Sequence, residues 1–416
     1  MKRRDFLRLA GMAGAAGVTI WTPGAQAAEA LAGANLASPA GTAHEAGHYR
    51  RLLILVELKG GNDGLNMLVP YADPLYRTLR PTLALRRETL LPLDERAALH
   101  PSLAPLLPAW QAHELAVVQG VGYPQPNLSH FRSIEIWDTA SRSDEYLGDG
   151  WLSRAFARAP VPPGFAADGV VFGSAEMGPL ANGARAIVLV NPAQFIGAAK
   201  LAHPVALREQ NPALAHLIDV ENDIVNAAAR LRPRDGAFAF GTAFPAGPFG
   251  TSVKTAMQVL AASESPQRQP LAGQGVAVLR LTLNGFDTHQ NQAGQQAALF
   301  KQLSEGLAAM RSALVELGRW DDTLVMTYAE FGRRVRENQS GGTDHGTSAP
   351  HFVMGGRVRG GLYGETPALA RLDGNGNLAV AVDFRQLYAT VLGPWWGIDS
   401  SAVLRGRFAP LPLLRA

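Results

Sequence analysis

The sequence of 416 residues contains no cysteine. This absence excludes disulfide bonds, thiolate metal ligands and cysteine nucleophiles. Any metal site must therefore be built from His, Asp, Glu, Asn and hydroxyl groups. No apolar run of about 18 residues or more follows the N-terminal segment, so we expect no stable membrane anchor.

The chain also lacks an excess of charge of one sign outside its N-terminus. Residues 1–27 contain four basic residues and one acidic residue, and the rest of the chain contains 34 of each. No basic stripe with interleaved aromatic residues is present, which argues against nucleic-acid binding. With 47% hydrophobic and 18% charged residues, the composition is that of a folded globular protein rather than a disordered chain or a coiled coil.

The N-terminus has the pattern of an export signal. Arg3 and Arg4 precede Asp-Phe-Leu, a weakly apolar run covers residues 11–20, and Ala25-Gln-Ala27 is a small-x-small cleavage pattern. This pattern resembles a twin-arginine signal, although an ordinary amphipathic helix is an alternative. We therefore predict a signal peptide at 1–27, a flexible lead-in at 28–48 and a single α/β domain at 49–416. The predicted location is periplasmic or secreted, with the twin-arginine translocation machinery as a partner.

Short apolar runs alternate with helical patterns along the rest of the chain, which predicts a largely parallel sheet covered by helices. A segment rich in Gly, Pro and Phe at 232–250 has the composition of a lid or a long excursion. The predicted strands are 52–58, 116–121, 169–172, 186–190, 275–283 and 323–328, and the predicted helices are 129–139, 211–231, 253–262, 295–317 and 384–392.

Polar side chains follow three of these strands, and a fourth polar pair lies in a loop soon afterwards. The clusters contain Asp63, then Asp287 with His289, then Glu330, and finally Asp344 with His345. The carboxyl ends of parallel strands share one edge of a sheet, so these groups can converge. Mixed His and carboxylate ligands favour zinc or manganese, whereas an all-oxygen set would suit calcium or magnesium.

Each of these residues also has a structural interpretation. Asp63 can shape a glycine-rich turn, and Glu330 can form an ion pair with Arg333 or Arg334. His289 can be an exposed loop residue, and His345 is ambiguous alone. The metal interpretation depends on the repetition of such groups at several strand ends.

Ser129 is the candidate nucleophile, because a hydroxyl at a helix N-terminus lies where backbone N–H groups favour an anion. Helix capping is its common alternative role. His130 can serve as a general base or can simply pack. Arg132, one turn further on, can neutralise a substrate oxyanion or form a surface ion pair.

Taken together, the motifs Gly-Gly-Asn-Asp-Gly-Leu-Asn, Ser-His-Phe, Gly-Phe-Asp-Thr-His, Ala-Glu-Phe-Gly-Arg and Thr-Asp-His-Gly resemble the exported proteins of the DUF1501 family. That family is similar to the alkaline phosphatase and sulfatase superfamily. The resemblance implies an α/β/α sandwich with a serine nucleophile at Ser129. It also implies one metal held by Asp287, His289 and His345, and a second facing Asp63, Glu330 and Ser129.

One departure from the superfamily pattern is Phe331, where a histidine usually follows the acidic ligand. Phenylalanine cannot bind a metal, so the second site would be weak, differently completed or absent. The expected function is an exported metal-dependent hydrolase of phosphate or sulfate esters, acting on a small-molecule or glycan ester. The alternative is a non-catalytic exported binding or assembly protein on the same scaffold.

Overall fold

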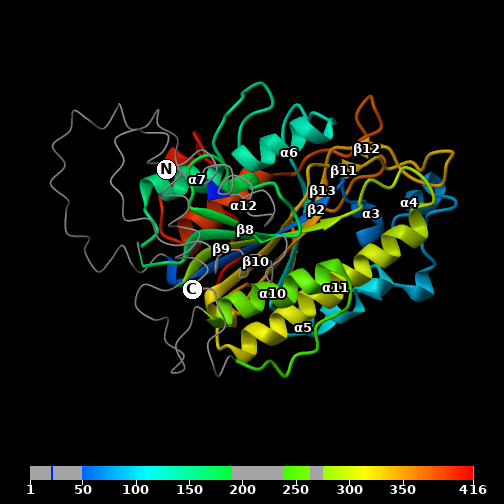
Figure 1. The fold of residues 1–416 in the computed structure, drawn as a ribbon. Coiled ribbons are helices and arrows are strands. Elements are labelled where there is room, and N and C mark those ends of the chain that lie inside the picture. The colour runs from blue at the N-terminus through cyan, green and yellow to red at the C-terminus, as the bar shows by residue number, and fades with distance from the viewer. Residues whose placement is uncertain (1–19, 22–48, 163, 190–237, 263–274, 416) are drawn as a thin grey trace, which may run out of the picture.

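The computed structural model describes residues 20–21, 49–162, 164–189, 238–262 and 275–415 (Figure 1). Several predictions lie outside these residues: the helix at 211–231, the lead-in at 28–48, most of the export signal and residues 232–237 of the predicted lid. None of the helices in the described ranges has the length and apolar character that crossing a bilayer needs.

A large twisted sheet forms the centre of the molecule, and its order is β1-β8-β7-β9-β2-β10-β13-β6-β14, with β15 also paired to β6. Neighbouring strands from β8 to β10 are parallel, whereas β13 runs antiparallel to both β10 and β6. The strands are β1 (Ile20–Trp21), β2 (Leu52–Lys59), β6 (Leu115–Gly122), β7 (Ala167–Phe172), β8 (Ala186–Leu189), β9 (Val276–Asn284), β10 (Thr323–Tyr328), β13 (Ala349–Met354), β14 (Gly361–Tyr363) and β15 (Val382–Asp383).

The central strand β2 shows why these segments are continuously apolar. Leu52 and Ile54 contribute to the core on one face of the sheet, and Leu53 and Leu55 to the core on the other. Successive side chains of a strand point to opposite faces, so a strand covered on both sides is apolar at every position.

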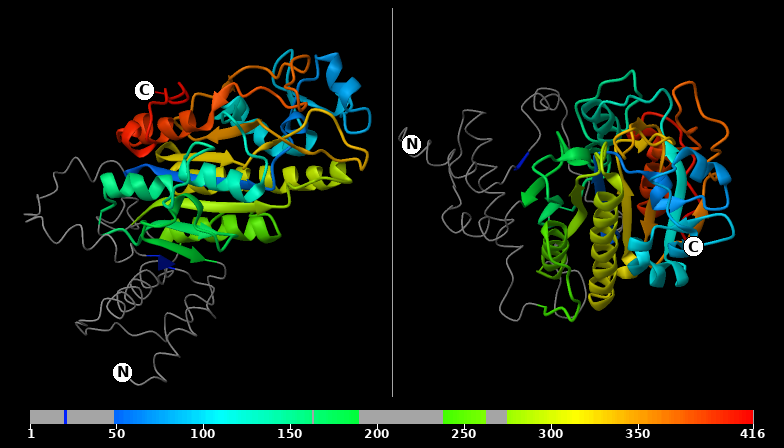
Figure 2. Two further views of the ribbon diagram at one scale, coloured as in Figure 1. Left: turned by 90° about the horizontal axis from the view of Figure 1, so that it is seen from above. Right: turned by 90° about the vertical axis from the view of Figure 1, so that its right-hand side faces the viewer.

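Helices cover both faces of the sheet, as the separate layers in Figures 1 and 2 show. One layer contains α5 (Leu107–Gln111), α10 (Pro248–Ala262) and α11 (Gln292–Glu316), and the other contains α6 (His130–Thr139), α7 (Trp151–Arg158) and α12 (Phe384–Thr390). The predicted three-layer α/β/α sandwich with a largely parallel sheet is therefore confirmed.

Shorter elements complete the fold: α3 (Gly64–Met67), α4 (Pro74–Leu79), α13 (Ser400–Val403), β3 (Leu68–Val69), β4 (Leu91–Pro92), β5 (Ala98–Leu99), β11 (Gly332–Arg333), β12 (His345–Gly346), 3₁₀ helices at Arg87–Thr89, Pro101–Leu106, Gly178–Leu180 and Trp320–Asp322, and a π-helical turn at Val391–Trp395.

The topology brings the candidate site together at one edge of the sheet. Strands β9, β2 and β10 are adjacent and parallel, so the segments that follow them leave from the same edge. The short β11–β12 pair then places His345 opposite Arg333. Strand β13, which the sequence pattern does not predict, carries the chain back antiparallel into the sheet.

Candidate metal centre

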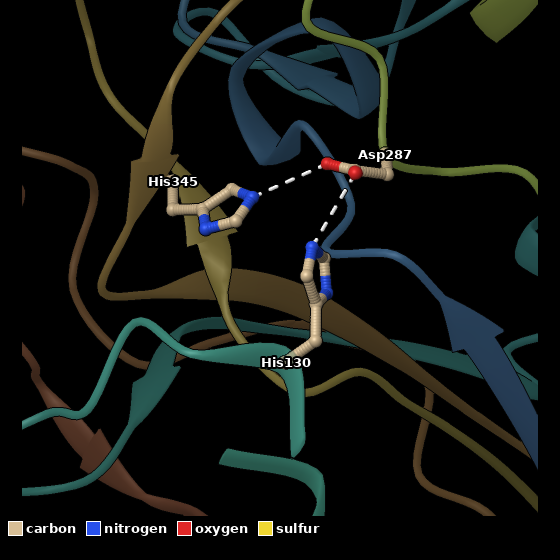
Figure 3. A group of neighbouring side chains, drawn as sticks. All are labelled: His130, Asp287 and His345. Carbon is tan, nitrogen blue, oxygen red and sulfur yellow. Dashed lines mark hydrogen bonds and ion pairs between the residues drawn. The ribbon is translucent and has the colours of Figure 1, made fainter. Parts of the chain in front are cut away.

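His130, Asp287 and His345 come together from three distant parts of the chain (Figure 3). One potential ligand atom from each lies within 4.8 Å of the others. The Nε2 atom of His130 is 3.4 Å from Asp287 Oδ2, and the Nε2 atom of His345 is 3.2 Å from Asp287 Oδ1. The carboxylate therefore lies between two imidazole nitrogens.

Hydrogen bonds on the far side of each ring fix which nitrogen faces the carboxylate. His345 Nδ1 donates to the carbonyl oxygen of Leu128 at 2.8 Å. His130 Nδ1 donates to Oε1 of Glu330 at 3.0 Å. With Nδ1 carrying the hydrogen, Nε2 of a neutral imidazole presents a lone pair toward Asp287. Burial lowers the pKa of His345, which favours this neutral form.

Facing lone pairs repel each other unless a positive charge lies between them. The lone pairs of His130 Nε2 and Asp287 Oδ2 face each other in this way, so either a proton or a cation must lie between the two atoms. The pKa of His130 is raised, chiefly by its hydrogen bond to Glu330 and further by the charge of Asp287, against the lowering effect of burial. In the metal-free protein we therefore expect a proton on this nitrogen, where a cation would compete with it.

Asp287 is held in its ionised form by a buried arginine. Partial burial by itself would raise the pKa of Asp287, but the hydrogen bond from Arg333 and the charges of Arg333 and His130 outweigh it and lower the pKa to about 2. Arg333 Nη2 lies 2.7 Å from Asp287 Oδ1. The same guanidinium donates to the carbonyl oxygens of Gly60 and Gly61, so it holds the turn that follows β2 against the Asp287 carboxylate.

Gly60 permits the close approach of this turn to Asp287. Its φ is +121°, a conformation that L side chains rarely adopt, and a Cβ atom there would lie 2.3 Å from the backbone nitrogen of Asp287. The glycine-rich sequence after β2 thus brings the two strand ends into contact.

His289 provides a fourth nitrogen beside the group of three. Its Nε2 atom is 3.0 Å from Asp287 Oδ1 and 3.0 Å from His345 Nε2. Because His345 Nε2 carries no hydrogen in the tautomer described above, His289 either donates an N–H to it or shares a cation with it. The His289 side chain is 44% exposed, so this side of the group is open to solvent.

The separations within this set fit a divalent cation. Ligand atoms at about 2.0–2.2 Å from a tetrahedral zinc are separated from one another by about 3.4 Å. The three contacts of Asp287 with the histidines and the contact between His289 and His345 range from 3.0 to 3.4 Å, and the ligand atoms of His130, Asp287 and His345 all lie within 4.8 Å of one another. Imidazole nitrogens with one carboxylate are a donor set that suits zinc or manganese. His130, Asp287 and His345 therefore form a group that could hold a metal, and His289 lies beside it.

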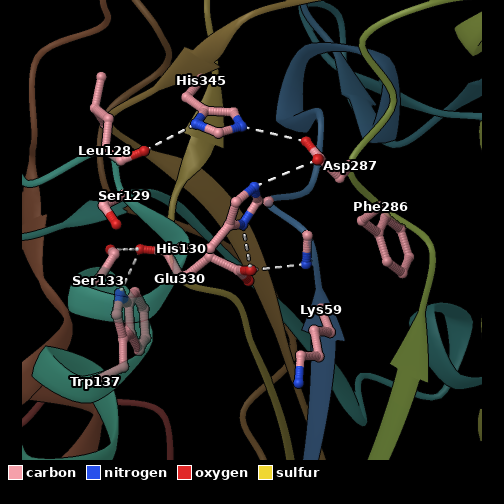
Figure 4. A network of polar contacts seen from close by, with 12 residues as sticks. Lys59, Leu128, Ser129, His130, Ser133, Trp137, Phe286, Asp287, Glu330 and His345 are labelled. Carbon is pink, nitrogen blue, oxygen red and sulfur yellow. Dashed lines mark hydrogen bonds and ion pairs between the residues drawn. The ribbon is translucent and has the colours of Figure 1, made fainter.

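Glu330, which the family resemblance assigns to a second metal, lies behind His130 rather than among the convergent atoms of this group. Its side chain is 2% exposed, and Oε1 also accepts from the Gly60 backbone N–H at 2.8 Å (Figure 4). Its backbone oxygen accepts from Ser133 Oγ and Trp137 Nε1. A carboxylate that orients a metal-binding histidine in this way strengthens the imidazole as a ligand.

The structure does not bring Asp63 into this group. Asp63 is 1% exposed and forms a buried ion pair with Arg80 at 2.5 Å. It also accepts hydrogen bonds from Gln292 Nε2 and from the backbone N–H of Leu65, so it caps α3. The physical reason is that both carboxylate oxygens already have donors, because Arg80 and Gln292 donate to Oδ2 and the Leu65 N–H donates to Oδ1.

Ser129 stands at the start of α6, as the sequence pattern predicts, but its side chain makes no capping hydrogen bond there. The residue is exposed. Its two neighbours both contact the group, because the Leu128 carbonyl accepts from His345 and the His130 ring faces Asp287 (Figure 4). The hydroxyl is thus attached to backbone that is fixed on both sides of it.

Arg132 points elsewhere, and this placement does not support the predicted oxyanion role. Its side chain is 8% exposed and pairs with Glu135 at 3.0 Å. The guanidinium donates to the carbonyl oxygens of residues 142, 143 and 145 and lies 3.9 Å from the Tyr146 ring centre. The loop after α6 provides these carbonyl acceptors, so the charge is used for structure.

Sequence reasoning assigned His130 to catalysis or packing and did not assign Arg333 to the site. The adjacency of His130 to the candidate nucleophile Ser129 indicates that His130 lies near the site, because both stand at the start of one helix. Arg333 belongs to the Ala-Glu-Phe-Gly-Arg motif, but its contact with Asp287 joins residues 46 apart. No local pattern indicates such a contact.

The family model for proteins of unknown function named DUF1501 matches residues 88–407. The chain belongs to the DUF1501 family. Its predicted membership is therefore confirmed. A search of curated proteins finds no match to the sequence.

Comparison with solved structures finds distant similarities. The chain has 10% identity and a TM-score of 0.37 with the lipoteichoic acid synthase LtaP from Listeria monocytogenes, covering 96% of this chain and 80% of that one. The zinc complex of the C-terminal periplasmic domain of EcEptC from Escherichia coli has 10% identity and a TM-score of 0.31, covering 73% and 72%. Alkaline phosphatase from the Antarctic bacterium TAB5 has 10% identity and a TM-score of 0.30, covering 76% and 94%.

Proposed function

We propose that this protein is a metal-dependent hydrolase of phosphate or sulfate esters that uses Ser129 as its nucleophile. The observation that carries the proposal is the convergence of imidazole nitrogens on Asp287, with the exposed Ser129 directly preceding His130 at the N-terminus of α6. His130, Asp287, His289 and His345 would hold the cation, with zinc or manganese favoured by the donor set. A bound divalent cation would polarise the ester oxygens and lower the pKa of an attacking hydroxyl.

The chain's own residues contribute positioning and charge. Glu330 and the Leu128 carbonyl orient the His130 and His345 rings, and Arg333 keeps Asp287 ionised. The oxygen of Ser129 would form a bond to the phosphorus or sulfur atom while the ester bond breaks and the alcohol leaves with a proton. The backbone N–H groups of the first turn of α6 favour the negative charge of the substrate at that place. Water then cleaves the covalent intermediate and releases phosphate or sulfate.

Replacing Ser129 with alanine tests the nucleophile. We expect hydrolysis of 4-nitrophenyl phosphate or sulfate to fall by at least about a thousandfold, because the covalent step is lost. Metal content and the circular dichroism spectrum should not change. Ser143→Ala is a matched control, because that hydroxyl lies in the loop after α6 and donates to the carbonyl oxygen of Pro124, which precedes the helix. Full activity of the Ser129 variant would disprove this role.

A binding or assembly protein is the second candidate, and the placement of Phe331 favours it. This ring is 3% exposed and packs 4.9 Å from the His130 ring centre and 4.4 Å from that of His345. It fills space beside the group where a further ligand would be needed for a second metal. If the purified protein binds zinc tightly and hydrolyses no ester across a broad panel, this second function replaces the first.

We also propose that the chain is exported by the twin-arginine route to the periplasm or beyond. The support is the Arg3-Arg4 pattern and the cleavage pattern at Ala25–Ala27. Replacing both arginines with lysine should leave the full-length chain in the cytoplasm, and fractionation with immunoblotting would detect it. Unchanged export of that variant would refute the proposed route.

A further inference from the structure

A second feature of the molecule is a cavity of about 160 Å³ between α3, the end of β6, the start of β13 and the loop segments around residues 366 and 378. Leu65, Leu68, Pro350 and Leu378 contribute apolar parts of its wall. An apolar cavity of about 150 Å³ in another protein is large enough to hold benzene. The space therefore accommodates a molecule with one ring or a short chain.

Gln119 provides a buried polar group in this wall. It belongs to β6, where Leu115 and Val117 point toward the core on the α11 face, and strand alternation places Gln119 on that same face. The residue is 4% exposed, and its Oε1 atom has no hydrogen-bond partner within the described part of the chain. A buried acceptor without a donor is destabilising, so such an atom in a cavity wall indicates an occupant with an N–H or O–H group.

The chemistry of the wall restricts that occupant. Most of the lining residues are apolar, and Gln119, Ser348 and Thr366 are the uncharged polar members of the lining. A compact alcohol or phenol satisfies both features, because its hydroxyl can donate to Gln119 while its carbon atoms contact Leu65, Leu68 and Leu378. Charged side chains of Glu365 and Arg371 lie at exposed positions of the lining, where they can remain hydrated.

We propose that this cavity is a binding site for a small hydroxyl-bearing ring compound, with Gln119 as the acceptor that selects the hydroxyl. The cavity is separate from the metal centre, although the two share Arg333, which forms part of the cavity wall and donates to Asp287. No metal is needed for this binding. The proposal therefore does not depend on the proposed hydrolase activity.

The test uses the full chain with phenol and benzene as probes, measured by ligand-observed NMR with titration. We expect the wild-type protein to bind phenol about tenfold more tightly than benzene, the difference that one net hydrogen bond gives. Gln119→Leu removes the acceptor with little change in volume, so it should remove the preference for phenol and retain benzene binding. Ala379→Phe adds a ring at an exposed position of the cavity lining and should weaken the binding of both probes.

Three outcomes would overturn the proposal. The first is that neither probe binds the wild-type protein, which would mean that water fills the cavity. The second is that Gln119→Leu keeps the full preference for phenol. The third is that Ala379→Phe leaves both affinities unchanged, which would place the probes elsewhere. Circular dichroism spectra of both variants identify any loss of folding.

Discussion

Replacing Glu330 with glutamine removes one buried negative charge while keeping the shape of the side chain. The amide oxygen of glutamine can still accept from His130 Nδ1 and from the Gly60 N–H, which lie 3.0 and 2.8 Å from Oε1. The amide nitrogen would take the place of Oε2, which has no hydrogen-bond partner among the described residues. The substitution therefore tests the effect of the charge on His130 rather than the effect of a missing contact.

We expect this variant to bind zinc about tenfold more weakly, which corresponds to about 1.4 kcal/mol. Loss of a supporting group behind a metal-binding histidine costs about 10- to 100-fold in affinity, and the retained hydrogen bonds place this variant at the lower end. Glu330→Ala also removes the hydrogen bonds and should approach the upper end. His345→Ala removes a ligand and should weaken binding further still.

The measurement is zinc affinity by competition with a chelator, together with NMR titration of His130 in the metal-free protein. Because the hydrogen bond to Glu330 is the largest cause of the raised His130 pKa, that pKa should fall in the glutamine variant. Glu176→Gln is a suitable control, since its carboxylate pairs with Lys59 at a site where its own side chain is 60% exposed. Unchanged zinc affinity and an unchanged His130 pKa would refute the supporting role of Glu330.

Two further substitutions test the packing around the site. Gly60→Ala should lower the free energy of unfolding by more than about 1 kcal/mol in urea titrations, because its Cβ would displace Asp287. For the same reason it should weaken zinc binding. Unchanged stability would show that the turn adapts to the added Cβ. Burial lowers the pKa of His351 to about 3. The stability that the buried neutral imidazole allows is therefore fully present above the unfolded pKa of about 6.5 and is lost as the pH falls toward 3. The loss amounts to up to about 1.4 kcal/mol per pH unit. His351→Phe should flatten this part of the stability profile relative to His113→Phe, and an equal acid dependence of the two variants would contradict the assignment.

Much of the fold follows from local sequence patterns. The apolar runs of β2, β9 and β10 predict strands that are buried on both faces, and the structure confirms all three. Helix α6 begins directly after Ser129, as the sequence predicts. The antiparallel strand β13 was not predicted, because its position between β10 and β6 depends on long-range pairing.

The sequence by itself determined which strand ends carry His and Asp. It also predicted that they share one edge, because parallel strands bring the segments that follow them to the same edge of the sheet. Only the tertiary structure decided what each side chain contacts there. Asp63 is neutralised by Arg80, Arg132 is held by loop carbonyls, and Glu330 supports His130 from behind. The physical reason is that the environment of a buried charge depends on partners far away in the sequence, which strand and helix periodicity does not encode.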